Sequence, residues 1–123
     1  MSRLGGNPAY HVEDNVFTVS GRILGGSGVA SIKAGKGFAL TYVSTGLYQI
    51  TPDVNFAGIA GGAAVLMSAS NNYAVRVKAY VVNTGSGAAC YVQFLVTSSG
   101  SATDLGSSDE LWFTLDFERT TKP

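Results

Sequence analysis

Apolar and polar residues alternate along short segments of this 123-residue chain, most regularly between Phe38 and Thr51. Phe38, Leu40 and Tyr42 alternate with small or polar residues, and a second alternating segment follows over 47–51. Period-two alternation is typical of a half-buried β-strand. Between the two segments, Ser44-Thr45-Gly46 has turn chemistry, with glycine able to supply a positive φ. We therefore expect a β-hairpin over 38–51.

The same alternation predicts further strands over 15–23, 29–35, 73–82, 89–97 and 110–118. In the segment 53–70, each glycine would cost about 1 kcal/mol inside a helix, so we expect a loop followed by a strand. No window keeps a helical period. The chain is therefore expected to be all-β, a single small antiparallel β-sandwich or jelly-roll-like domain over 15–118. An extended N-terminal arm (1–14) and a short tail (119–123) flank it.

Three of these strands carry apolar or aromatic side chains on a face that is expected to point outward. The strand at 89–97 is apolar on both faces, which is typical of a strand covered on both sides. The strand at 110–118 places Leu111, Phe113, Leu115 and Phe117 inward and Trp112 outward. In 73–82, Tyr80 is expected on the outer face with Arg76 and Lys78. An ordinary half-covered aromatic ring is the alternative explanation, but interface cores are enriched in aromatic residues. The expected subunit interface comprises Tyr80, Tyr91, Gln93, Leu95 and Trp112.

Composition strengthens the expectation of a covered surface. Hydrophobic residues make up 46% of the chain and charged residues only 13%, against about 25% charged in a typical soluble domain. Eight basic residues balance eight acidic ones, which argues against a nucleic-acid partner. No apolar run reaches the ~18 residues of a membrane span. The N-terminus lacks a signal-peptide core, so synthesis in the cytoplasm is expected.

Reactive chemistry is sparse. The one histidine, His11, lies in the arm, and one histidine cannot build a metal site alone. Cys90 sits in an apolar run and is expected to be a buried small hydrophobe. Asp104, Asp109 and Glu110 share a polar loop that could attract Ca²⁺, but turn formation is the stronger interpretation. The glycine-rich segments match neither a dinucleotide fingerprint nor a P-loop. We expect no catalytic, cofactor-binding or metal-binding residues, and no enzyme.

Two segments resemble a pattern found in virion proteins of tailed bacteriophages. They are "GKGFALTYVSTGLYQITP" and "YVQFLVTSSGSATDLGSSDELWFTLDFE". The resemblance covers roughly 16–118 and rests on turn-and-strand patterns. It implies a small β-sandwich that packs as a homotrimer on phage heads or in tail fibres, with no catalytic residues to transfer.

The resemblance leads to two expectations. The first is a capsid decoration (cement) protein on the virion surface, which binds and stabilises the lattice of the major capsid protein. The alternative is a tail-fibre or head-fibre domain that recognises a host or a glycan. A fibre polypeptide usually carries a long repetitive shaft, whereas here only 14 residues precede the sandwich, which favours the decoration protein.

The N-terminal arm has too few apolar residues to fold alone. Its apolar and aromatic residues are nevertheless spaced along an extended segment. We therefore expect the arm to order against a neighbouring decoration or capsid subunit. The expected contact residues are Leu4, Pro8, Tyr10 and His11.

Overall fold

The computed structural model describes residues 16–26, 29–69, 72–82 and 90–119. The expected arm contacts Leu4, Pro8, Tyr10 and His11 lie outside these residues, as does most of the tail. The described residues form strands without helices, so the all-β expectation is confirmed. The strands are β1 (Val16–Gly26), β2 (Val29–Gly35), β3 (Phe38–Ser44), β4 (Leu47–Pro52), β5 (Phe56–Met67), β6 (Ala74–Val81), β7 (Tyr91–Ser98), β8 (Ser101–Ala102) and β9 (Glu110–Arg119).

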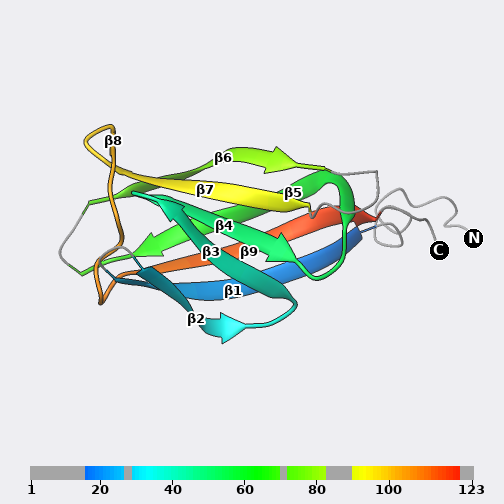
Figure 1. The fold of residues 1–123 in the computed structure, drawn as a ribbon, viewed down its shortest axis with the longest axis horizontal. Coiled ribbons are helices and arrows are strands. Elements are labelled where there is room, and N and C mark those ends of the chain that lie inside the picture. Colours follow the sequence, from blue (N-terminus) through cyan, green and yellow to red (C-terminus); the bar gives the residue numbers. More distant parts are fainter. Residues whose placement is uncertain (1–15, 27–28, 70–71, 83–89, 120–123) are drawn as a thin grey trace, which may run out of the picture.

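The strands form two antiparallel sheets packed face to face (Figure 1). One sheet has the order β2-β1-β9-β5, and the other has the order β3-β4-β7-β6, with β8 paired to β7. Hairpins join β1 to β2, β3 to β4, and β6 to β7 within a sheet. The chain crosses between sheets from β2 to β3, β4 to β5, β5 to β6 and β8 to β9. The expected sandwich is therefore the observed architecture.

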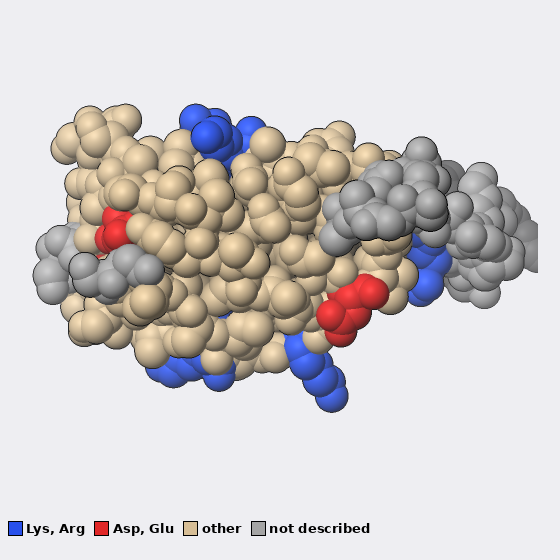
Figure 2. Space-filling model, in the orientation of Figure 1, with Lys and Arg blue, Asp and Glu red and all other residues tan. Residues whose placement is uncertain are grey.

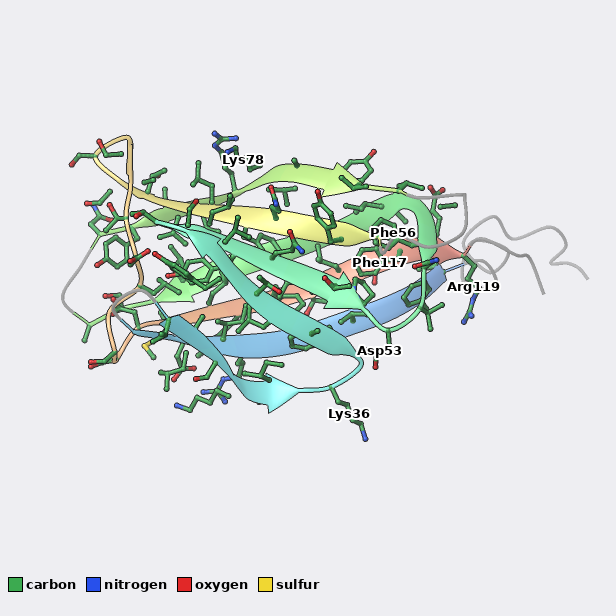
Figure 3. All side chains as sticks on the ribbon, viewed as in Figure 1. Lys36, Asp53, Phe56, Lys78, Phe117 and Arg119 are labelled. Carbon is green, nitrogen blue, oxygen red and sulfur yellow. The ribbon has the colours of Figure 1, made fainter. Side chains whose placement is uncertain are left out.

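Aromatic side chains hold the two sheets together. Phe113 of β9 meets Phe38 of β3 edge to face at 5.2 Å between ring centroids, and meets Phe94 of β7 at 5.7 Å. Toward one end of the sandwich (Figure 3), the ring centroids of Phe56 and Phe117 lie 4.4 Å apart, and both side chains are fully buried. The inward positions predicted for β9 are confirmed, since Leu111, Phe113, Leu115 and Phe117 are all buried.

The β3–β4 hairpin forms where the sequence predicts it. Ser44 pairs with Leu47 across a two-residue turn, and Gly46 has a φ of +72°. Pro52 ends β4, which fits the missing N–H donor of proline. Cys90 is buried as expected, with its Sγ 3.6 Å from the carbonyl oxygen of Phe56.

The loop over 103–109 closes one end of the sandwich. Leu105 is buried there, and its backbone N–H donates to the Tyr48 hydroxyl over 2.8 Å; burial raises the pKa of Tyr48 to about 12. Asp104 accepts hydrogen bonds from the Tyr42 hydroxyl and the Gly46 N–H. Asp109 accepts from the N–H of Gly106 over 2.9 Å. Both aspartates therefore organise the loop, as the turn-former interpretation predicted.

The pairing of strand β6 shows that the expected orientation of Tyr80 was wrong. A β-bulge between Val77 and Ala79 shifts its register, so Tyr80 pairs with Val92 rather than following the outer-face alternation. Because Val92 is in the core, Tyr80 lies on the core-facing side of β6, not on the outer face with Arg76. Tyr80 is nevertheless 51% exposed, because β6 is the edge strand of its sheet. A bulge adds one residue and reverses the side-chain parity beyond it.

Candidate interaction surfaces

The outer face of the β3-β4-β7-β6 sheet is almost free of charge. Strands β3, β4 and β7 contain no Asp, Glu, Lys or Arg. Figure 2 shows a broad uncharged area in the middle of this face, with an acidic group toward each end and basic groups along the edge beside β6 and at the opposite edge. At its centre, Gln93 donates to the Gln49 side chain over 3.0 Å. Uncharged surfaces of this kind are typical of interface cores.

The five expected interface residues lie on separate parts of the molecule. Tyr91, Gln93 and Leu95 share the uncharged outer face, because they alternate with buried Val92, Phe94 and Val96. Trp112 projects from the outer face of the other sheet, on the far side of the sandwich, and is 41% exposed. Tyr80 lies on neither of the two outer faces. The structure therefore brings together three of the five residues.

Trp112 belongs to a charged cluster that the sequence did not predict. Its indole N–H donates to Glu110 Oε1 over 2.8 Å, and the Arg22 guanidinium lies 5.2 Å above the ring. Glu110 also forms ion pairs with Arg22 at 2.8 Å and with Lys33 at 2.6 Å. Lys33 reaches Glu110 from a bulge in β2 opposite Arg22 and Ile23. Only 4% of the Glu110 side chain is exposed, because these three side chains cover it.

Hydrogen-bond donors around Glu110 stabilise the ionised form of its carboxyl group. Hydrogen bonds from Lys33, Trp112 and Arg22, in that order, lower the pKa of Glu110 from 4.5 to about 2. Both carboxylate oxygens are occupied, so Glu110 is poorly placed to act as a general acid or base. The arrangement instead immobilises a partly exposed tryptophan on a flat sheet surface. Such a ring is suited to stacking against a planar or sugar surface.

The lowered pKa predicts a dependence of stability on pH. A carboxyl group with a depressed pKa in the folded state contributes stability above its unfolded pKa, near 4.5, and this contribution is lost as the pH falls toward 2. Glu110→Gln should therefore be clearly less stable than the native chain in urea unfolding at pH 7. The difference in the free energy of unfolding between the two proteins should close at pH 2. A gap that is the same at both pH values would contradict the ion-pair role.

Glu118→Gln is the matched control for this measurement. Glu118 is exposed on the same strand and takes part in neither of the ion pairs found among the described residues. Its replacement should leave the stability and its pH dependence nearly unchanged, because exposed single charges contribute little.

A second feature missed by the sequence reasoning is a groove between the edge strands β5 and β6. Its volume is about 340 Å³, and Phe94 and Leu115 of the core are among its lining residues. Gly61, Gly62, Ala63 and Ala64 of β5 line one side. The signal available in the sequence was the run of small uncharged residues in β5, which leaves the space beside the core unfilled.

The described residues contain no group of three His, Cys, Asp or Glu side chains placed to hold a metal ion. Within the same residues, no helix is long and apolar enough to cross a membrane. Comparison with protein-family models, with curated proteins and with solved structures gave no match.

Proposed function

We propose that this chain is a structural subunit of a tailed-phage virion, a decoration protein that binds the major capsid protein lattice as a homotrimer. The observation that carries the proposal is the uncharged outer face formed by three adjacent strands, β3, β4 and β7. Leaving such a face in water has no structural advantage for a monomer, whereas a neighbouring subunit would cover it. The sequence resemblance to virion proteins supports the same role.

Self-association is the first test. Light scattering at tens of micromolar should give about three times the chain mass of 12.7 kDa. Gln93→Lys should yield monomers, because it places a charge in the centre of the covered face. Thr114→Lys, an exposed position on the outer face of the other sheet, is the control and should leave the trimer intact. A native chain that remains monomeric would overturn the proposed assembly.

Shell binding is the second test. The native trimer should co-sediment with undecorated coat-protein shells from the same genome and raise their resistance to heat. A trimer that neither binds nor stabilises these shells would contradict the decoration role while leaving self-association standing.

The Trp112 cluster favours one alternative, a fibre domain that recognises a glycan. Exposed tryptophan rings held rigid by polar neighbours are suited to stacking on sugars. A glycan array probed with the native protein tests this alternative. Glycan binding that disappears in Trp112→Ala, combined with failure to bind shells, would replace the decoration role with the fibre role.

A further inference from the structure

The strand β5 offers an unprotected sheet edge. It is the last strand in the order β2-β1-β9-β5, so one side of its backbone has no partner strand among the residues that the structure describes. Its twelve residues include no charged residue and no proline. Bulges interrupt the pairing near Phe56 and Ile59, but from Gly61 to Met67 the register with β9 is regular. Natural sheets usually protect such edges with lysine, proline or bulges, as β6 does with its bulge and Lys78.

The groove next to this edge borders the buried core. It lies between β5 and β6, and its lining includes Phe94, Leu115 and Val77. A strand added to the free side of β5 would extend the sheet over this groove. Alternate side chains of the added strand would then point into the groove, while the others would face solvent. The groove is therefore suited to an extended segment with apolar residues at every second position.

The rim of the groove is basic. Arg76 is one of its lining residues, and Lys78 points away from the edge of β6 in Figure 3. The ion pairs found among the described residues use Arg22 and Lys33, so Arg76 and Lys78 have no acidic partner there. Two copies joined edge to edge through β5 would bring these basic rims together. An incoming segment that carries acidic residues avoids that repulsion.

We propose that residues 9–14 of a neighbouring copy add to β5 as a strand. Their sequence is Ala-Tyr-His-Val-Glu-Asp. Tyr10 and Val12 are two positions apart and would enter the groove, while His11 faces solvent. Asp14 follows on the same side as Val12 and would bring negative charge to the rim that carries Arg76, while Glu13 would lie on the solvent side with His11.

The short connection to β1 decides which neighbour can receive the segment. Only Asn15 separates Asp14 from Val16, a span of about 7 Å when extended. The exchange therefore requires that β5 of the neighbouring copy lie directly beside the start of β1. Three copies that each donate a segment to the next would close a ring, which is how a trimer uses two different patches. The inference rests on the proposed self-association but not on the virion role.

Cross-linking of the full chain tests the proposal. His11→Cys and Ala63→Cys are combined in a Cys90→Ala background and treated with a short bismaleimide. Ala63 is exposed on β5 and pairs with outward-facing Thr114. We expect covalent dimers and trimers on a denaturing gel. The matched control carries Ser31→Cys in place of Ala63→Cys, at an exposed position on β2 at the other edge of the same sheet. This control should give few covalent dimers or trimers.

Charge reversal supplies a second measurement. Arg76→Glu should lower the yield of cross-linked dimers and trimers several-fold, whereas Lys36→Glu, at the opposite edge in Figure 3, should not. Cross-links found only within single chains, or yields equal to those of the Ser31→Cys control, would overturn the proposal. A trimer by light scattering without the cross-link would leave the proposed assembly intact and refute only this inference. A monomer would refute both.

Discussion

Replacing Phe113 with alanine is expected to lower the free energy of unfolding by about 3–5 kcal/mol. Phe113 is only 4% exposed, and it joins the two sheets through its contacts with Phe38 and Phe94. Truncation removes this bridge and leaves a cavity that the paired strands around it cannot easily close. Urea unfolding followed by circular dichroism measures the loss.

Thr114→Ala provides the control on the next residue of β9. Thr114 is exposed on the outer face, and its hydroxyl lies 3.3 Å from that of Ser20. Its replacement should change the free energy of unfolding by no more than about 0.5 kcal/mol. A loss below about 1 kcal/mol for Phe113→Ala would mean that the ring does not carry the packing between the sheets.

The regular strands were predictable because their side chains have a strict period of two. Buried residues alternate with outward ones from Leu111 to Glu118 in β9 and from Tyr91 to Thr97 in β7, so the faces could be assigned from the sequence. The β3–β4 hairpin was predictable because its turn contains a glycine at the position that needs a positive φ. In these elements the local sequence was sufficient to predict the structure.

Tyr80 shows where local chemistry is insufficient. The segment around it alternates as regularly as β9, but a bulge at Lys78 reverses the parity beyond it. A bulge depends on the partner strand, here β7, and the sequence of one strand does not reveal it. The same limit applies to β5, whose two bulges fall in the half that was expected to be a loop.

The charged cluster was missed for a related reason. The sequence placed Glu110 at the start of the strand over 110–118 and grouped it with the turn-forming Asp104 and Asp109, but it did not reveal that Arg22 and Lys33 cover its side chain. These partners lie 88 and 77 positions away in the chain, so only the strand order brings them to Glu110. The strand order also separates Trp112 from Gln93, which the sequence had assigned to a common interface.

Gly46→Ala should lower the free energy of unfolding by about 2–5 kcal/mol, in two parts. The first is conformational, because Gly46 has a φ of +72°, which costs an L-residue about 1–2 kcal/mol. The second is steric, because a Cβ there would lie 2.6 Å from the carbonyl oxygen of Val96 and 2.8 Å from the Thr103 N. Both contacts are with backbone, so neither neighbour can rotate away. Urea unfolding measures the total.

Gly37→Ala separates the two parts. Gly37 has a comparable φ of +89° and flanks the same hairpin, but a Cβ there would meet nothing within 4 Å. Its replacement should therefore cost only the conformational part, about 1–2 kcal/mol. The β3–β4 turn is held at the closed end by two hydrogen bonds: Val96 N–H donates to the Gly46 carbonyl oxygen over 2.8 Å, and Gly46 N–H donates to Asp104. The additional loss of stability in Gly46→Ala, beyond that in Gly37→Ala, measures how firmly the turn is held there. Equal losses at the two glycines would show that this loop moves aside without cost, and that the turn is not a fixed part of the closed end.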